Sequence, residues 1–91
     1  MAISEETLRY LEQLSNSVDS APWVSMIEGR DHTSGDSFIL TGTEFNRGPD
    51  IYVNEDSIPA AAACLDLIAA ARTNLPVLIQ EIRTLRSNAV N

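Results

Sequence analysis

A long stretch near the C-terminal end of the chain repeats apolar residues at helical spacing. Between Ser57 and Ser87, apolar side chains recur in steps of three and four, at Ile68, Ala71, Leu75, Leu78, Ile79, Ile82 and Leu85. This period is typical of a helix that turns one face toward a core. Ser57 is suited to cap the first turn, and Pro59 is tolerated there because its missing N–H would have no partner.

Pro76 interrupts this helical pattern. A proline inside a helix removes one backbone hydrogen bond and crowds the carbonyl four residues earlier, which here belongs to Arg72. We expect the helix to kink or to restart at this point, with Asn74 capping the second segment. The C-terminal third of the chain is therefore predicted to form a kinked helix pair.

Shorter patterns in the first half of the chain predict one helix and three strands. Ser4 to about Asn16 is expected to be helical, with Ser4 as the cap and a leucine stripe at every third position. Alternating apolar side chains predict strands at 23–28, 37–41 and 50–53, and their short connections favour an antiparallel meander. The fold class predicted for residues 1–91 is a single α+β domain with the helix pair packed on the sheet. Because both faces of the sheet carry large apolar groups, we expect the second face to contact another copy of the chain.

The composition narrows the classes of partner. The net charge of −7 argues against duplex nucleic acid, which requires a basic face. No uninterrupted apolar run reaches the ~20 residues of a membrane helix, so no membrane contact is expected. One cysteine, Cys64, excludes an internal disulfide, and a cytoplasmic location is the expectation. All six basic residues are arginines, which suit paired recognition of carboxylates and phosphates, although biased genomic composition is the favoured explanation.

The first candidate site is the loop between the first two predicted strands, Gly29 to Asp36. It contains Arg30, Asp31 and His32, and long loops on rigid strands often carry binding residues. Three alternatives are open here. Asp31, His32 and Asp36 offer metal ligands, but a single histidine makes this set weak, and no metal or cofactor is predicted. His32 with Ser34 offers a base and a nucleophile, and the loop residues can also simply satisfy backbone groups.

Two further candidates lie outside that loop. Phe45 and Arg47 stand on the turn between the second and third predicted strands, where an aromatic ring and a guanidinium can grip a planar, anionic ligand. The alternative is that Phe45 is a hydrophobic plug. Arg72 is the last candidate, since it precedes the predicted helix break, where unpaired helix-end groups gather.

Two segments resemble small uncharacterised proteins of bacterial genomes and prophages. They are WVSMIEGRDHTSGDSFILTG and DLIAAARTNLPVLIQEIRTLR, whose most specific parts are residues 28–31 and 70–72 with Pro76. Leu67 stands where that pattern prefers Phe, and Asn74 where it prefers Asp. The arrangement of a small sheet with kinked C-terminal helices also looks like phage anti-defence sponges of the Thoeris type. That resemblance implies a non-enzymatic oligomer that sequesters a nucleotide-derived immune signal, with Arg30 and Arg72 as ligand contacts.

These observations lead to two functional expectations. The first is a non-catalytic, homo-oligomeric protein that holds an anionic small molecule of nucleotide type between the loop Gly29 to Asp36 and the kink at Arg72. The second is an acidic immunity or inhibitor protein that uses its charge to engage a basic protein partner. They differ in a feature that a structure reveals: an anion site needs arginines that converge, whereas an inhibitor needs a continuous acidic face.

Overall fold

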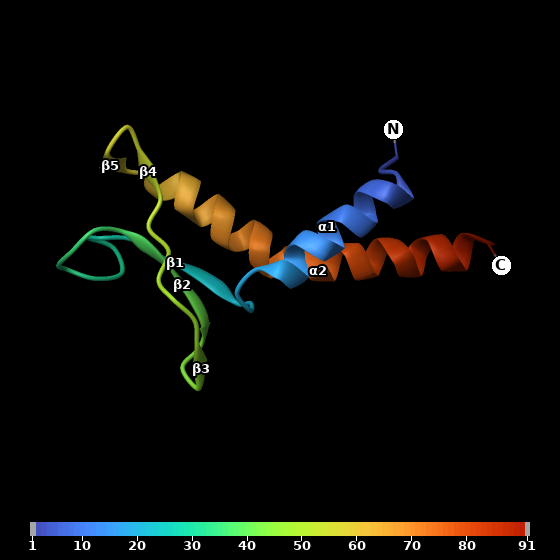
Figure 1. Cartoon of the computed structure of the whole chain (residues 1–91), viewed down its shortest axis with the longest axis horizontal. Coiled ribbons are helices and arrows are strands. Elements are labelled where there is room, and N and C mark those ends of the chain that lie inside the picture. Colours follow the sequence, from blue (N-terminus) through green and yellow to red (C-terminus); the bar gives the residue numbers. More distant parts are fainter. Residues whose placement is uncertain (1, 91) are drawn as a thin grey trace.

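A computed structural model describes residues 2–90 of the chain. In chain order, the elements are α1 (Glu5–Ser17), β1 (Trp23–Met26), β2 (Phe38–Thr43), β3 (Asn46–Arg47), β4 (Asn54–Glu55), β5 (Ile58–Pro59) and α2 (Ala62–Val90). The strands gather around the N-terminal half of α2, while α1 runs back along its C-terminal half (Figure 1). The α+β class is confirmed, with an N-terminal helix, a three-stranded antiparallel sheet and a long C-terminal helix.

β2 is the central strand of the main sheet, and it pairs antiparallel with β1 and β3. Side chains along β2 alternate between the face of the sheet that lies toward α2 and the opposite face. Ile39 and Thr41 are fully buried on the side toward α2, and Ile39 lies opposite Ser25 of β1 in the ladder. Phe38 lies on the other side, where its ring stacks 5.5 Å from that of Tyr52.

The position predicted for the third strand is wrong. Of residues 50–53, Ile51 alone bridges to β2, through two hydrogen bonds with Ile39 of 2.8 and 2.9 Å. The third strand of the sheet is instead β3, which begins after a tight turn at the end of β2. Pro49 explains the shift, because it has no N–H to donate to a ladder and so separates β3 from Ile51.

The start predicted for the C-terminal helix is also wrong. Ser57 does not cap a helix; it forms the turn of a short hairpin between β4 and β5. Asp56 and Ser57 both have positive φ, 48° and 74°, as a two-residue hairpin turn that follows the natural strand twist requires. α2 begins only at Ala62.

α2 is one continuous helix of 29 residues with Pro76 inside it. Figure 1 shows that it changes direction near its middle, so the expected kink is present and the alternative of a restart is not. Asn74 accordingly caps no second segment, and its side-chain nitrogen donates to the Ala70 carbonyl 2.8 Å away.

Two packing regions hold the elements together. The main core lies between the sheet and the first half of α2, and its buried members are Ile27, Ile39, Ala60, Leu65 and Ala69. The second region is the contact of α1 with the second half of α2, where Leu8 and Ile79 are buried. α1 begins as predicted, with the Ser4 hydroxyl accepting from the Thr7 N–H.

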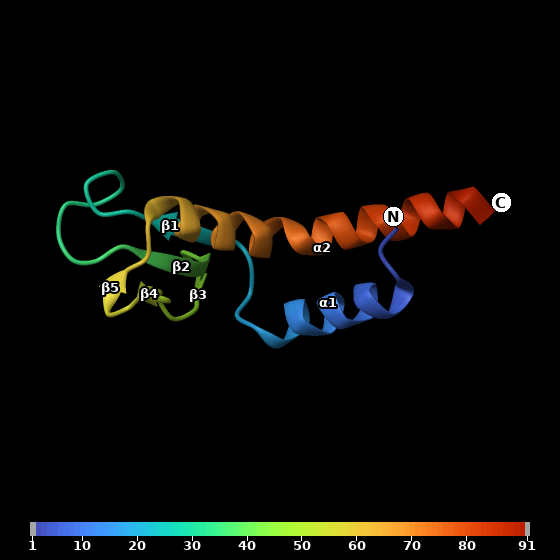
Figure 2. The ribbon, with the colours of Figure 1, turned by 90° about the horizontal axis from the view of Figure 1, so that it is seen from above.

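α2 is only partly covered by the rest of the chain. Its segment Ala62–Ala89 has a mean hydropathy of 1.5 in its most apolar window, which by length and composition is sufficient to span a membrane. The sequence holds no uninterrupted apolar run of ~20 residues, but α2 reaches this mean hydropathy with polar residues between its apolar ones. Only 17% of that window is buried, so the helix is not a fully enclosed core helix either. Seen from above, α2 extends along most of the length of the molecule, with the sheet and α1 against different parts of it (Figure 2).

Candidate ligand-binding site

The loop after β1 is folded back on itself by Asp31. Its carboxylate accepts the Ile27 N–H at 2.8 Å, and the backbone N–H groups of Arg30 and Asp31 both donate to the Ile27 carbonyl. The Ile27 N–H and the Arg30 guanidinium both hold the pKa of Asp31 below its usual range, the former contributing more. These bonds fix Arg30 at the edge of the sheet nearest α2.

Arg30 donates hydrogen bonds to two carboxylates of the same chain. Two of its nitrogens donate to the two oxygens of Asp66 on α2, each at 3.0 Å, and Nε donates to Asp31 at 3.0 Å. Ser25 also donates to Asp66, and together the Arg30 and Ser25 bonds lower the pKa of Asp66 to about 2. Asp66 raises the pKa of Arg30 in return. The guanidinium nitrogens of Arg30 are thus already bonded to carboxylates of the same chain.

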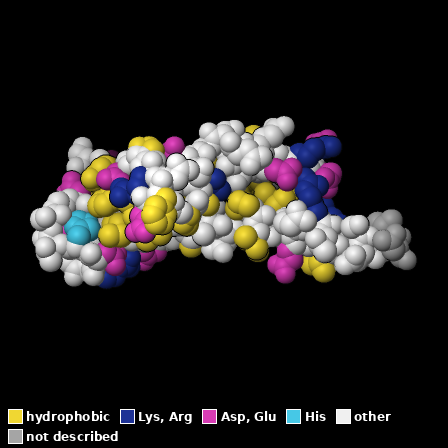
Figure 3. Space-filling model, turned by 90° about the horizontal axis from the view of Figure 1, so that it is seen from below, with side chains coloured by type: hydrophobic (Ala, Val, Ile, Leu, Met, Phe, Trp, Pro, Cys, Tyr) yellow, Lys and Arg dark blue, Asp and Glu magenta, His cyan; other side chains and the backbone are white. Residues whose placement is uncertain are grey.

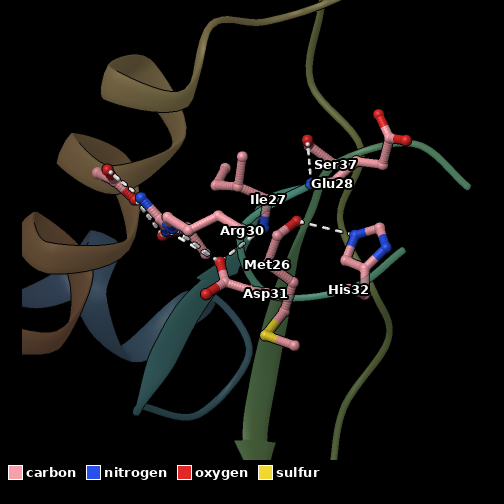
Figure 4. A network of polar contacts seen from close by, with 9 residues as sticks. Met26, Ile27, Glu28, Arg30, Asp31, His32 and Ser37 are labelled. Atoms are coloured by element: carbon pink, nitrogen blue, oxygen red, sulfur yellow. Dashed lines mark hydrogen bonds and ion pairs between the residues drawn. The ribbon is translucent and has the colours of Figure 1, made fainter. Parts of the chain in front are cut away.

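His32 lies on the other side of the loop from Arg30 (Figure 4). Its Nδ1 is 2.8 Å from the Ser34 carbonyl oxygen and its Nε2 is 3.3 Å from that of Met26, while its ring stacks 5.6 Å from Phe38. Both ring nitrogens thus contact backbone acceptors and not the Ser34 hydroxyl that the base–nucleophile pairing would require. Within residues 2–90, no group of three His, Cys, Asp or Glu side chains is placed to hold a metal ion.

Arg72 joins three elements of the fold. It donates to the Ser15 hydroxyl of α1 at 3.0 Å and to the Asp19 carbonyl at 3.2 Å, and its guanidinium carbon lies 5.8 Å from the centre of the Trp23 ring. Its Nε is buried without a partner. Trp23 donates its indole N–H to the same Asp19 carbonyl at 3.0 Å, so Arg72 and Trp23 jointly fix the linker after α1. Arg30 and Arg72 therefore bind separate sets of partners, and nothing in these contacts brings them to one ligand.

A cavity of about 170 Å³ lies beside the turn between β2 and β3. Its walls come from the linker after α1 and from this turn: Asp19, Ser20, Gly42, Asn46, Arg47 and Gly48. Arg47 supplies the only cation among these lining residues, and its guanidinium donates to Asp50 at 2.9 Å. Two of the lining residues are glycines because the chain packs closely there: a Cβ on Gly42 would meet the Asn46 carbonyl and one on Gly48 would meet the Thr41 hydroxyl.

Phe45 stands on the same turn with 92% of its surface exposed. A phenylalanine this exposed does not plug a core, so that alternative reading of the sequence is excluded for the single chain. Asn46 begins β3 with its N–H donated to the Thr43 hydroxyl at 3.1 Å, which closes the turn and leaves the ring outside it. The turn thus presents an aromatic face within two residues of the arginine that lines the cavity.

One residue of the cavity wall, Arg47, was among the candidates taken from the sequence, and Phe45 stands on the same turn without lining the cavity. Asp19 and Ser20 were not candidates, because nothing in a linker pattern indicates which strand the linker crosses. Gly42 did carry a usable signal, since a glycine inside a strand often marks a close approach of another backbone. Arg72 belongs to the site only indirectly: it holds the Asp19 backbone, and Asp19 lines the cavity.

Comparisons with protein-family models, with curated proteins and with solved structures found no match to this chain. Function is therefore inferred from the geometry of the turn, the arginine clusters and the exposed helix faces.

Proposed function

We propose that the protein is a non-catalytic binding protein that acts in the cytoplasm as an assembly of more than one copy and takes up a planar, anionic small molecule of nucleotide type. The observation that carries this proposal is the turn between β2 and β3, where a 92% exposed Phe45 stands two residues before Arg47, which lines the cavity. Exposing a phenylalanine ring to water is unfavourable, so a ring in this position suits a partner that stacks on it.

Each part of such a ligand has a matching group at the turn. The ring of Phe45 offers a stacking surface for a base, and Arg47 offers a charge-assisted bond to a phosphate. The Asp19 carboxylate suits a hydroxyl donor such as that of a ribose, because it accepts hydrogen bonds and repels phosphate. The cavity is smaller than the ~300 Å³ at the lower end of ordinary small-molecule sites, so it holds one group of the ligand while the rest lies over Phe45.

Arg47 is the arginine best placed for this role. Its bond to Asp50 is a single contact between side chains that are 47% and 35% exposed, so an incoming phosphate competes with a weak, solvated pair. Arg30, in contrast, is already bound by two carboxylates. The proposed binding mode differs here from the one the sequence suggested, since it depends on Arg47 and Phe45 and gives Arg72 a positioning role. Sequestration of a nucleotide-derived signal requires that the ligand be bound and requires no catalytic group.

Thermal shift and calorimetric titration with AMP, ADP and cyclic AMP test the proposal. Arg47→Ala should weaken binding by roughly ten- to a hundredfold, the value of a charge-assisted hydrogen bond of ~1.5–3 kcal/mol. Phe45→Ala should weaken it by a similar factor through lost stacking. Arg9→Ala and Tyr10→Ala are matched controls, because both residues are exposed on α1 away from the cavity. A wild-type protein that binds none of the three nucleotides contradicts the proposal.

A second function, engagement of a basic protein, is favoured by the distribution of charge. Ion pairs among the described residues involve five of the 13 carboxylates, Glu5, Glu12, Asp31, Asp50 and Asp66. Five of the others lie in the loops and hairpin of the sheet end, at Glu28, Asp36, Glu44, Glu55 and Asp56. Binding of a basic partner that weakens steeply with salt, and with Glu55→Gln, but not with Arg47→Ala, would favour this function over the first.

A further inference from the structure

One side of α2 carries an uninterrupted apolar stripe of heptad type. From Cys64 onward the steps alternate strictly between four and three, through Ile68, Ala71, Leu75, Leu78, Ile82, Leu85 and Ala89. Cys64 and Ile68 at the start of the stripe pack against the main core, whereas Leu78 and Leu85 further along are 53% and 63% exposed. The residues that α2 does bury in its own chain, Leu65, Ala69 and Ile79, form a separate row on an adjacent side. A strict alternation of three and four is the pattern by which one helix packs along another.

α1 adds a second stripe on the same side of the helix pair. Leu11 is half-buried, and Leu14 and Val18 are 44% and 47% exposed. The two helices are antiparallel, because Glu5 pairs with Arg83 while Ser15, further along α1, accepts from Arg72, earlier in α2. On each helix the exposed stripe is rotated in the same sense from the contact with the other helix. In antiparallel helices this rotation carries both stripes to one side of the pair.

The molecule has too much surface and too great a radius for a lone domain of its size. Its accessible surface is 6473 Å², whereas a 9.9 kDa monomer typically exposes about 5,200 Å². Its Cα radius of gyration is 16.0 Å, against about 12 Å for a compact chain of this length. The surplus of roughly 1,300 Å² exceeds the ~800 Å² per partner that a stable interface buries. The α1–α2 pair contributes only Leu8 and Ile79 as buried apolar side chains, which is too little to hold two projecting helices alone.

We infer that the joined stripe of α1 and α2 is the surface on which a second copy of this chain packs, so that two helix pairs form a four-helix bundle. We call this surface the helical seam; its residues are Leu11, Leu14, Leu75, Leu78, Ile82 and Leu85. It gives the assembly in the proposed function a definite interface, and it uses residues other than those of the cavity. An experiment can therefore disprove the helical seam without disproving the nucleotide site, and the reverse.

A second protein chain fits the seam better than lipid does. A helix that spans a membrane alone is apolar all round. α2 instead carries a polar stripe opposite the seam, at Asp66, Thr73, Gln80 and Thr84. Asp66 and Thr73 are bonded to the sheet, through Arg30 and the Trp23 backbone. Charged side chains gather at the far end of the helix pair, including those of Glu5, Arg83 and Arg86 (Figure 3). This one-sided pattern is that of a bundle helix.

Sedimentation velocity of the full chain from about 1 to 100 µM tests the seam. The wild type should be a dimer or a higher assembly of dimers. Leu78→Glu should raise the dissociation constant at least roughly a hundredfold, since it replaces a leucine that two copies each bury with a charge. Val77→Glu is the matched control: Val77 is 62% exposed and adjacent, yet its position on the helix lies off the seam. It should leave the dimer intact.

Several results would overturn the inference. They are a wild-type monomer at 100 µM, equal weakening by Leu78→Glu and Val77→Glu, and a protein that sediments with membranes until detergent is added. Should Leu78→Glu lose its helical circular dichroism, Leu78→Ala gives the same comparison without a charge and should still shift the equilibrium toward monomer. A dimer that binds no nucleotide would support the seam and contradict the proposed ligand. A monomer that binds nucleotide would contradict the seam and support the proposed ligand.

Discussion

Replacing Arg72 by alanine separates a structural arginine from a ligand-binding one. Three contacts are lost: a bond to the Ser15 hydroxyl at 3.0 Å, a bond to the Asp19 carbonyl at 3.2 Å and the approach to the Trp23 ring. The partly buried charged bond contributes about 1.5 kcal/mol, the exposed one about 0.5 and the ring contact about 0.5–1. Removal of the buried, unpartnered Nε offsets about 1 kcal/mol of this loss of stability. The free energy of unfolding should therefore fall by about 1.5–2 kcal/mol.

Urea denaturation followed by circular dichroism measures this change directly. In a domain of 91 residues the same loss lowers the melting temperature by roughly 6–16 °C. Arg9→Ala is the control, since Arg9 is exposed on α1 and its removal should change stability by no more than about 0.5 kcal/mol. Ser15→Ala and the double variant complete a cycle whose coupling energy should be about 1 kcal/mol. Unchanged stability in Arg72→Ala with a large loss of nucleotide affinity would refute this reasoning and restore Arg72 as a direct ligand contact.

Three further substitutions follow from the backbone and the charges. Ser57→Gly should stabilise the protein by about 0.5–1 kcal/mol, because φ is 74° at this position and glycine adopts it without strain; a lower melting temperature would contradict this. Gly42→Ala should destabilise it by more than about 1 kcal/mol, because φ is 79° and the new Cβ would meet the Asn46 carbonyl; wild-type stability in denaturation would be the wrong outcome. The pKa of Asp66 falls to about 2 in the folded state, so its contribution to stability should be present above pH 4 and be lost as the pH falls toward 2. Asp66→Asn should flatten stability between pH 4 and 2, and an acid transition as steep as that of the wild type would exclude this role.

Local patterns predicted the elements of this fold better than its long-range contacts. The cap at Ser4, the first two strands and the bend in α2 all follow from residues close in sequence. The β4–β5 hairpin was missed because it depends on positive φ at Asp56 and Ser57, which Asn and Gly signal more clearly than Asp and Ser do. The third strand lies at β3 and not at residues 50–53 as the apolar pattern indicated. Pro49 has no N–H to donate to the ladder, so the ladder ends before it.

The site was predictable only where its residues are neighbours in the chain. Phe45 and Arg47 lie on one turn, so their proximity could be inferred from sequence alone. The bond from Arg30 to Asp66 joins residues 36 positions apart, and that from Arg72 to Ser15 joins residues 57 apart. Alternation along strands and helices indicates which face a side chain takes, but it does not indicate which acid an arginine will meet. Both arginines were therefore expected at a ligand site, and both are bound within the chain.

The central claim is that the turn of Phe45 and Arg47 holds a planar anion, and native mass spectrometry tests it most directly. Wild type and Arg47→Ala, purified from cells in the same way, should be compared for the mass of the intact assembly and of any retained small molecule. The account predicts an assembly of at least two chains that carries a phosphate-containing ligand in the wild type, and an assembly of the same size without that ligand in Arg47→Ala. Bare wild-type protein that stays bare after incubation with nucleotides, or the same adduct on both proteins, would contradict it.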